Sequence, residues 1–170
     1  MTKQALAILL IACTFAGAQT DQENDRRIQQ TQSRGYWIDP STGLMWAAKD
    51  NGQNINWGHA MKYCQKLYLA GYSDWRLASM VELQGIYQEN PYASRPAPKG
   101  TEYVFMGAPR GGLQLTGNHY WSSTIRLDDR GKRSGYAYFF MFDLPNSSYN
   151  SDPTGYFGSK RALCVRTPSK

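Results

Sequence analysis

The sequence of 170 residues predicts a small α+β domain, and three observations support this fold class. A candidate β-hairpin comes first, two stretches with helical periodicity follow it, and three further candidate strands follow a long Pro- and Gly-rich segment. Strands and helices that occur in separate runs are typical of α+β domains. We therefore expect two helices packed on small antiparallel sheets, a long loop region and one disulfide.

The first 18 residues have the features of a secretory signal peptide. Lys3 is the single charged residue before Asp21. The apolar run at residues 5–12 is too short to span a bilayer. Small residues follow at positions 16–18, so we expect cleavage after Ala18. This predicts an exported protein, periplasmic or extracellular.

A second interpretation of the N-terminus is a lipoprotein signal. The sequence Leu10-Ile11-Ala12-Cys13 resembles a bacterial lipobox, in which Cys13 becomes the lipidated N-terminus. No later segment is apolar enough for a membrane-spanning helix, so we expect no transmembrane segment.

The cysteine count predicts one disulfide. Cleavage after Ala18 removes Cys13 and leaves Cys64 and Cys164. An even number of cysteines in an exported chain favours a disulfide. The bond would close a loop of about 100 residues, which the chain-entropy model values at roughly 4–5 kcal/mol. The alternative is a pair of buried free thiols, whereas redox catalysis is disfavoured because the chain has no C-x-x-C motif.

Composition divides the mature chain into two parts. Residues 19–33 are polar, with Ile28 as their single aliphatic residue, and we interpret them as a linker or a frayed helix outside the core. Residues 34–170 form the predicted domain, which is long enough for one hydrophobic core and too short for two.

The first part of the domain predicts a hairpin and two helices. Residues 36–38 and 44–46 are apolar runs separated by turn-forming residues, which is the pattern of a β-hairpin. Asn56 begins a helix in which four residues recur at helical spacing, and Gly71 would end it; these residues are Ala60, Cys64, Leu67 and Tyr68.

The second helix and the strands after it complete the plan. Ser79 to Glu82 has the capping-box pattern, and Leu83, Ile86 and Tyr87 supply a buried stripe. Residues 91–118 are a long Pro- and Gly-rich loop with one candidate strand at 103–105. Three candidate strands follow, and we expect them to form a β-meander; they are residues 119–125, 136–143 and 161–167.

Several motifs in this order resemble a known bacterial family. They are Gly43-Leu44-Met45-Trp46, the helix with Cys64, Gly71-Tyr72-Ser73-Asp74-Trp75-Arg76-Leu77, Glu82-Leu83, Tyr120-Trp121-Ser122-Ser123 and Cys164-Val165-Arg166. Together they resemble the C-terminal domain of the Legionella collagen-like adhesin. The resemblance implies a C-type-lectin-like fold whose disulfide joins the first helix to the last strand. The namesake adhesin binds sulfated polysaccharides. The chain has Leu77-Ala78-Ser79 where the family usually has Leu-Pro-Thr.

Enzymatic and metal-dependent functions find little support in the sequence. No G-x-S-x-G motif surrounds Ser122 or Ser123, and neither His59 nor His119 is positioned by sequence to serve them. The two histidines share no metal-ligand spacing with the cysteines. The motifs through which C-type lectins bind sugar with calcium are absent. We therefore expect no catalytic site, metal or cofactor. We interpret Asp74-Trp75-Arg76 as structural, with Trp75 in the core and the two charged side chains bound to nearby backbone.

A binding module remains, and its recognition surfaces should be loops. Removing the leader lowers the net charge from +6 to +5; such an excess favours anionic partners, and alternatively it only keeps a small domain soluble. An exported protein rarely meets nucleic acid, so we expect an anionic or sulfated glycan. The predicted contacts are Arg126, Arg130, Lys132, Arg133, Tyr149 and Asn150. The alternative is a structural or assembly subunit of the cell envelope; a hydrolase is a more distant alternative, and the sequence leaves the oligomeric state open.

Overall fold

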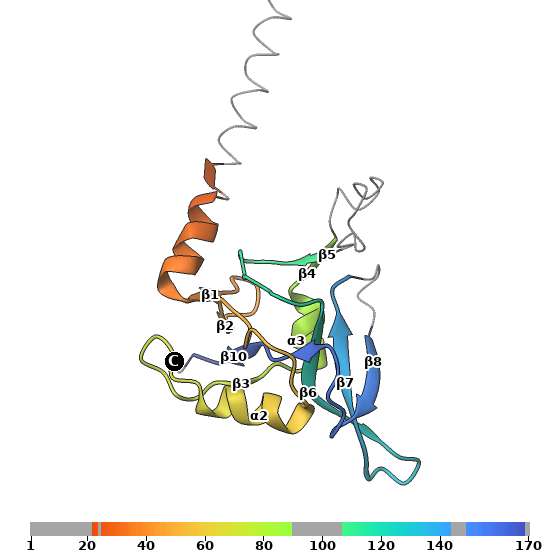
Figure 1. Cartoon of the computed structure of the whole chain (residues 1–170). Coiled ribbons are helices and arrows are strands. Elements are labelled where there is room, and N and C mark those ends of the chain that lie inside the picture. Colours follow the sequence, from red (N-terminus) through yellow and green to blue (C-terminus); the bar gives the residue numbers. More distant parts are fainter. Residues whose placement is uncertain (1–21, 24, 90–106, 144–148, 169–170) are drawn as a thin grey trace, which may run out of the picture.

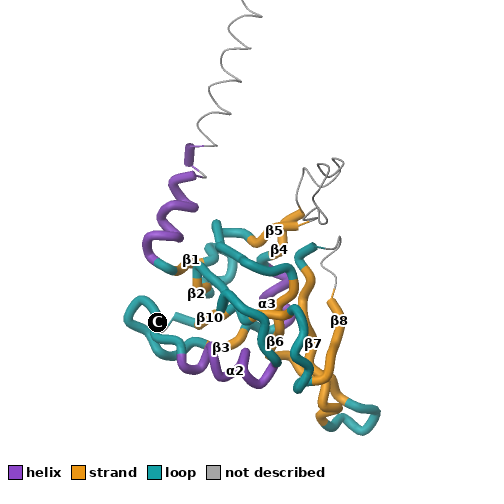
Figure 2. The backbone as a smooth tube through the Cα atoms, viewed as in Figure 1, coloured by secondary structure: helices purple, strands orange, loops and turns teal. Residues whose placement is uncertain are grey.

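The computed structural model describes residues 22–23, 25–89, 107–143 and 149–168, and these form an α+β domain as predicted (Figure 1). Two four-stranded sheets and one two-stranded sheet are packed with helices. The predicted signal peptide, Cys13 and the candidate strand at 103–105 lie outside the described residues. The tube view in Figure 2 shows that loops make up much of the described part of the chain.

The predicted hairpin is present and its turn is closed by an aspartate. Strand β1 (Tyr36–Ile38) pairs antiparallel with β2 (Met45–Ala47). The carboxylate of Asp39 accepts hydrogen bonds from the Ser41 hydroxyl at 2.7 Å and the Thr42 hydroxyl at 2.8 Å. An aspartate that binds polar groups two and three residues later is a common turn former, so the local sequence determines this hairpin.

The first sheet joins the beginning of the domain to its end. Strand order is β1-β2-β10-β3, so β10 (Cys164–Arg166) lies between the hairpin and β3 (Arg76–Leu77). Both neighbours of β10 are antiparallel to it. The last strand of the chain is therefore held on both edges and is fully buried.

The first predicted helix forms but ends earlier than expected. Helix α2 (Trp57–Lys66) begins at Asn56, whose side chain accepts a hydrogen bond from the His59 backbone N–H at 2.9 Å. The buried side of α2 carries Ala60 and Cys64, as predicted. The predicted end at Gly71 is wrong, because the backbone becomes extended after Lys66. As a result Tyr68 is 73% exposed rather than part of the buried stripe.

The second helix is short and has the predicted cap. Helix α3 (Met80–Gly85) has a complete capping box between Ser79 and Glu82. Leu83 and Ile86 are buried. The predicted stripe residue Tyr87 instead begins strand β4 (Tyr87–Glu89), which pairs with β5 (Gly107–Pro109) in the two-stranded sheet.

The last sheet contains a strand that the sequence did not predict. Its order is β8-β7-β6-β9, where β6 is His119–Leu127 and β7 is Arg133–Met141. Strand β8 (Tyr149–Pro153) lies in the segment expected to be a polar connection. It pairs antiparallel with β7 over five residue pairs, so sheet pairing overrides the turn-forming composition of this segment.

The predicted β-meander is wrong at its third strand. The segment expected as one strand divides into β9 (Lys160–Arg161) and β10, which belong to different sheets. Strand β9 is parallel to β6, whereas we expected antiparallel sheets throughout. Ala162 and Leu163 form the step between the sheets and are both completely buried. A strand that changes sheets at a bend is a known way to close a packed β-structure.

The predicted disulfide is confirmed. Cys64 on α2 and Cys164 on β10 are bonded, with their Cα atoms 5.4 Å apart, and both residues are buried. The bond fixes the helix against the first sheet. The prediction that the fold is C-type-lectin-like stays a prediction.

Large aromatic side chains make up much of the core. Trp46, Trp75 and Trp121 are at most 2% exposed. Trp121 donates from its indole N–H to the Ile55 carbonyl at 2.8 Å. Because aromatic residues bury the most apolar surface, these residues account for the tryptophan-containing motifs of the sequence.

The polar N-terminal segment is helical and touches the domain. Residues 22–23 and 25–34 are helical, and this helix lies beside β1, away from α2 (Figure 1). Thr31 is only 5% exposed. Ile28 lies against Gly112, so close that a methyl group added to the glycine would come within 2.9 Å of the Ile28 Cα. The helix therefore packs on the domain surface.

Candidate functional site

The predicted basic loop is the tip of the β6–β7 hairpin, which projects from the domain in Figure 1. Asp128 closes the turn by accepting hydrogen bonds from the backbone N–H groups of Arg130 at 2.9 Å and Lys132 at 2.8 Å. The basic side chains of the tip are all exposed; they are Arg126, Arg130, Lys132 and Arg133. The turn thus presents several cations on a defined backbone.

The other two predicted contacts lie elsewhere. Tyr149 and Asn150 are on β8, paired with Phe140 and Phe139 of β7. Phe140 is seven residues along β7 from Arg133, a separation of about 23 Å at about 3.3 Å per strand residue. Both residues are exposed, but they form a surface separate from the basic tip. The structure therefore divides the predicted site in two.

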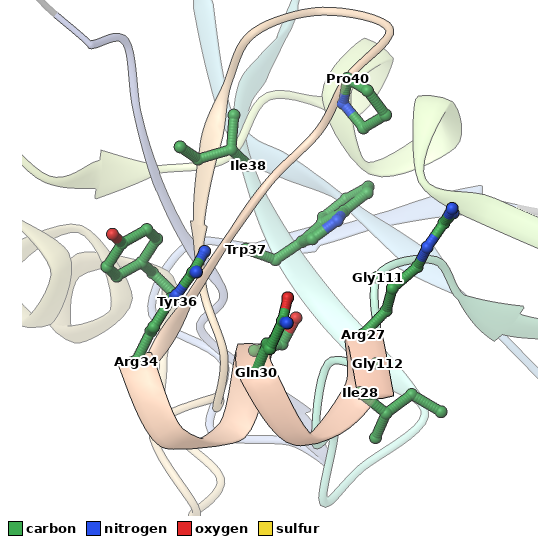
Figure 3. Close-up of a pocket in the computed structure, with 11 residues that line it drawn as sticks. Arg27, Ile28, Gln30, Arg34, Tyr36, Trp37, Ile38, Pro40, Gly111 and Gly112 are labelled. Atoms are coloured by element: carbon green, nitrogen blue, oxygen red, sulfur yellow. The ribbon is translucent and has the colours of Figure 1, made fainter. Parts of the chain in front are cut away.

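A groove that the sequence did not predict lies between the N-terminal helix and the first hairpin (Figure 3). Its volume is about 490 Å³. The helix, β1 with the turn after it, and the segment before β6 all contribute to it. Its lining residues are Arg27, Ile28, Gln30, Thr31, Arg34, Tyr36, Trp37, Ile38, Pro40, Gly111 and Gly112.

Two arginines stand at opposite ends of this groove. Figure 3 shows Arg27 and Arg34 on either side, with Gln30 and Trp37 between them. Seven residues separate the arginines along the helix, which is nearly two turns, so they share one face about 10 Å apart. Arg27 also pairs with Glu23 at 2.6 Å, but both side chains are more than half exposed. An exposed pair of this kind contributes little stability, and its arginine is free to exchange partners.

A pair of glycines forms the floor of the groove. A Cβ atom on Gly111 would lie 2.1 Å from the Trp37 ring, so the indole rests directly on the glycine backbone. Gly112 has the corresponding contact with Ile28. Both glycines have positive φ, 76° and 68°, a conformation that other residues rarely adopt. The docking of the helix and the position of Trp37 thus both depend on this glycine pair.

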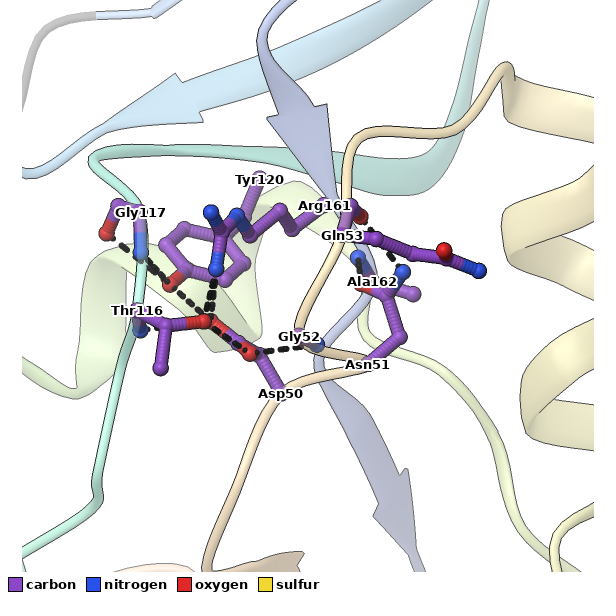
Figure 4. Close-up of polar contacts among 9 residues, drawn as sticks. All are labelled: Asp50, Asn51, Gly52, Gln53, Thr116, Gly117, Tyr120, Arg161 and Ala162. Atoms are coloured by element: carbon purple, nitrogen blue, oxygen red, sulfur yellow. Dashed lines mark hydrogen bonds and ion pairs between the residues drawn. The ribbon is translucent and has the colours of Figure 1, made fainter.

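A buried carboxylate anchors the segment that carries the glycines (Figure 4). Asp50 accepts hydrogen bonds from the Thr116 backbone N–H at 2.7 Å, the Thr116 hydroxyl at 2.6 Å and the Tyr120 hydroxyl at 2.6 Å. Arg161 adds an ion pair at 3.8 Å. Burial, and next the contact with Asp50, raise the pKa of Tyr120, so this hydroxyl stays a donor. The network is structural and holds the groove floor in place.

A further cation lies near the groove. Arg110 immediately precedes Gly111 and is exposed. Its charge acts on Asp39, in the turn beside the groove. Burial alone would raise the pKa of Asp39, but hydrogen bonds from Ser41 and Thr42, together with Arg110, lower it overall. The Asp39 carboxylate is thus ionised, and the hydrogen bonds from Ser41 and Thr42 already satisfy it.

The residues considered for hydrolysis have other surroundings in the structure. Ser122 is completely buried and donates its hydroxyl hydrogen to the Tyr138 carbonyl oxygen at 2.9 Å. His119 faces Asp143 at 3.3 Å, whereas His59 is exposed on α2. Within the described ranges, no three His, Cys, Asp or Glu side chains converge in a way that suits a metal ion.

The Asp74-Trp75-Arg76 motif is structural, as predicted, but its charges have different partners from those expected. We expected the two charged side chains to bind nearby backbone. Asp74 instead receives two hydrogen bonds from Arg166, at 2.7 and 3.0 Å, and Arg76 donates two to Glu82, at 2.8 and 2.6 Å. Trp75 is in the core. The motif therefore connects β3 to α3 and to the last strand.

These features define a small α+β domain in which a disulfide fastens helix α2 to the last strand, β10. The family model of the Lcl C-terminal domain matches residues 35–166, and the chain belongs to this family of bacterial surface-associated domains. No curated protein matches the sequence. Arg27, Gln30 and Arg34 precede the matched residues, so the groove combines the family domain with a preceding helix. None of the helices in the described part of the chain has the length and apolar character needed to cross a bilayer.

Proposed function

We propose that this protein is an exported binding module that attaches to acidic polysaccharide, without calcium. One observation carries the proposal: the groove holds two arginines on either side of an aromatic ring. Arginine binds carboxylate and sulfate through paired, charge-assisted hydrogen bonds. A tryptophan beside it supplies an apolar surface for a sugar ring. The combination suits a glycan that carries anionic groups.

The spacing of the arginines favours a linear polymer. Arg27 and Arg34 lie about 10 Å apart on one helix face, close to the length of two sugar rings. In many acidic polysaccharides every second sugar is charged. Successive anionic groups would then meet successive arginines, and the uncharged ring between them would lie over Trp37 and Gln30.

The basic hairpin tip is a second contact surface for the same class of ligand. Its four cations are exposed and Asp128 is occupied by the turn. The tip is convex, so it adds long-range attraction rather than an enclosed site. Tyr149 and Asn150, at the other end of β7, are expected to contribute less than the sequence suggested.

A structural or assembly subunit of the envelope is the competing function. Such a subunit needs a contiguous exposed apolar patch. The large exposed hydrophobic residues of the described chain are mostly tyrosines, whose hydroxyl groups make these surfaces less apolar, and this favours the binding module. The buried and hydrogen-bonded state of Ser122 speaks against a hydrolase that uses this residue.

The test is binding of the secreted protein to an array of sulfated, uronic-acid and neutral glycans. Binding to acidic glycans should weaken from low to physiological salt, because salt screens exposed charges. It should survive a chelator. The paired change Arg27→Gln and Arg34→Gln should reduce affinity about tenfold, which corresponds to roughly 1.4 kcal/mol.

A charge-matched control separates site from net charge. Lys62→Gln with Lys66→Gln removes the same charge from α2, where both lysines are exposed, and should change affinity much less. The triple change Arg130→Ser, Lys132→Ser and Arg133→Ser measures the hairpin tip separately. Absence of binding to every acidic glycan contradicts the proposal, and binding that a chelator abolishes contradicts its calcium-free part.

A further inference from the structure

A second hollow lies on a different part of the domain. It is formed by the loop before α2, by one side of α2 and by the loop between β8 and β9, and its volume is about 360 Å³. Its lining residues are Asn51, Gln53, Asn54, Ile55, His59, Tyr63 and Phe157. It shares no residue with the arginine groove.

The lining of this hollow contains no Asp, Glu, Lys or Arg residue. Three side-chain amides supply hydrogen-bond donors and acceptors without charge. Burial, and then the charge of Asp50, raise the pKa of Tyr63, so its hydroxyl remains protonated. A ligand with a net charge would find no Asp, Glu, Lys or Arg in the lining and only His59 as a possible cation, so the lining favours an uncharged partner rich in hydroxyl groups.

Two aromatic side chains border the hollow and remain open to solvent. Phe157 is 66% exposed and Tyr63 is 37% exposed. The Phe157 side chain has no polar atom that could interact with water. Its exposed ring therefore contributes hydrophobic free energy only when a partner covers it. The negative face of an aromatic ring attracts weakly positive C–H groups, such as those on the apolar side of a sugar.

The loop that supplies the amides is held in place before any ligand arrives. Asn51 accepts a hydrogen bond from the Ala162 N–H at 2.7 Å and donates its side-chain N–H to the Gln53 carbonyl at 2.6 Å. The backbone N–H of Ile55 donates to the Lys160 carbonyl at 2.9 Å. Figure 4 shows the Gln53 side chain extending away from the Asp50 network. A rigid loop loses little entropy on binding.

We propose that this hollow binds an uncharged sugar unit, whose ring stacks on Phe157 while its hydroxyls bind the Gln53 and Asn54 amides. Its size lies at the lower end of ligand pockets, about 300–1,000 Å³, which suits one or two sugars. A peptide is disfavoured because none of the lining residues belongs to a strand, so no free strand edge is offered to an extended chain.

The experiment is an NMR titration of the isotope-labelled secreted protein. The probes are neutral gluco-, galacto-, manno- and N-acetylglucosamine oligosaccharides at millimolar concentration. At least one series should shift the signals of Gln53, Asn54 and Phe157 in a saturable manner. Phe157→Ala should weaken that binding at least tenfold, whereas Phe157→Tyr should retain it, because the ring face is preserved.

Two further variants make the result decisive. Tyr68→Ala removes an aromatic ring that is 73% exposed outside the hollow, and it should leave binding unchanged. Gln53→Ala tests the amide contact independently if Phe157→Ala disturbs the fold. Saturable binding that persists in both Phe157→Ala and Gln53→Ala overturns the proposal, as does no response to any neutral series, or a response to a peptide alone.

The two sites can fail separately. Replacing Arg27 and Arg34 by Gln should not change the affinity for neutral sugars. Phe157→Ala should not change the affinity for acidic polysaccharide bound in the groove. Loss of acidic binding with intact neutral binding would overturn the proposed function alone.

Discussion

At the residue scale, buried charges are balanced by several partners at once. Arg166 is 2% exposed, donates two hydrogen bonds to Asp74 and lies 3.7 Å from the centre of the Tyr72 ring. Lys160 is 3% exposed, is paired with Asp152 and has aromatic rings around its ammonium group. A buried charge is costly unless it is paired. Arg166 therefore links strand β10 to Asp74, and Lys160 links strand β9 to Asp152 on β8.

The capping box of α3 leads to a pH-dependent prediction. Burial of Glu82 raises its pKa, but hydrogen bonds from Arg76 and Ser79 outweigh burial, so the pKa lies below the ordinary value of 4.5. A lowered pKa in the folded state stabilises the protein above pH 4.5, and this stabilisation disappears as the pH falls through the folded-state pKa. Glu82→Gln should therefore cost roughly 1 kcal/mol at pH 7. The cost should shrink below about pH 4.5.

The measurement is denaturant unfolding of both proteins from pH 3 to pH 7. Arg76→Gln is the partner variant, since it removes the same pair from the other side. The double variant should cost less than the sum of the two single variants. A difference between wild type and Glu82→Gln that does not change with pH would show that the pair contributes nothing specific.

Single-residue roles were predictable where the partners are close in sequence. Ser79 and Glu82 are three residues apart, and their cap was predicted correctly. Asp50 was not singled out, because Thr116 and Tyr120 are 66 and 70 residues away along the chain. Asp74 was singled out within its motif, but its partner Arg166, 92 residues away, was not predicted. Long-range pairs of this kind leave no local pattern in a single sequence.

At the element scale, the packing of the N-terminal helix gives a direct test. Gly112→Ala should release the helix, because the added methyl group would lie 2.8 Å from the Ile28 Cγ1 and 2.9 Å from its Cα. The variant should lower thermal stability and speed amide hydrogen exchange in residues 25–34. It should also weaken acidic-glycan binding, since Arg27 and Arg34 would leave the groove.

Gly131→Ala is the matched control for this change. Gly131 also has a positive φ, 72°, but a methyl group there meets nothing within 4 Å. It should cost only the backbone strain, roughly 1–2 kcal/mol. If both variants lose the same stability and exchange in residues 25–34 is unchanged, the helix does not depend on its contact with Gly112.

Elements with strong local signals were predicted, and elements defined by packing were not. The first hairpin and both family-domain helices have turn or cap residues beside a periodic pattern. Strand β8, by contrast, contains Asn, Ser, Asp and Pro, and becomes a strand because β7 offers a partner. The division of the last strand into β9 and β10 depends on how two sheets meet, which no local pattern records.

At the scale of the whole molecule, the candidate site shows the limit of sequence reasoning. The basic cluster at residues 126–133 was visible because it is contiguous. Its expected companions, Tyr149 and Asn150, were grouped with it by composition, and the structure places them at the other end of β7. The arginine groove was not visible, since it requires the helix at residues 25–34 to meet a glycine pair some 80 positions later.

The disulfide joins distant parts of the domain, and removing it gives the last prediction. It joins residues 100 positions apart and links α2 to β10, the strand at the centre of the first sheet. Cys64→Ala with Cys164→Ala should cost up to about 4–5 kcal/mol, because the unfolded chain regains the freedom of a long loop. The melting temperature should fall by roughly 10–20 °C.

Thermal unfolding with and without reductant measures this fall, and thiol titration of the unfolded, unreduced protein checks that the bond is present. Reductant should leave the double variant unchanged; two reactive thiols per wild-type chain would show that the bond is absent.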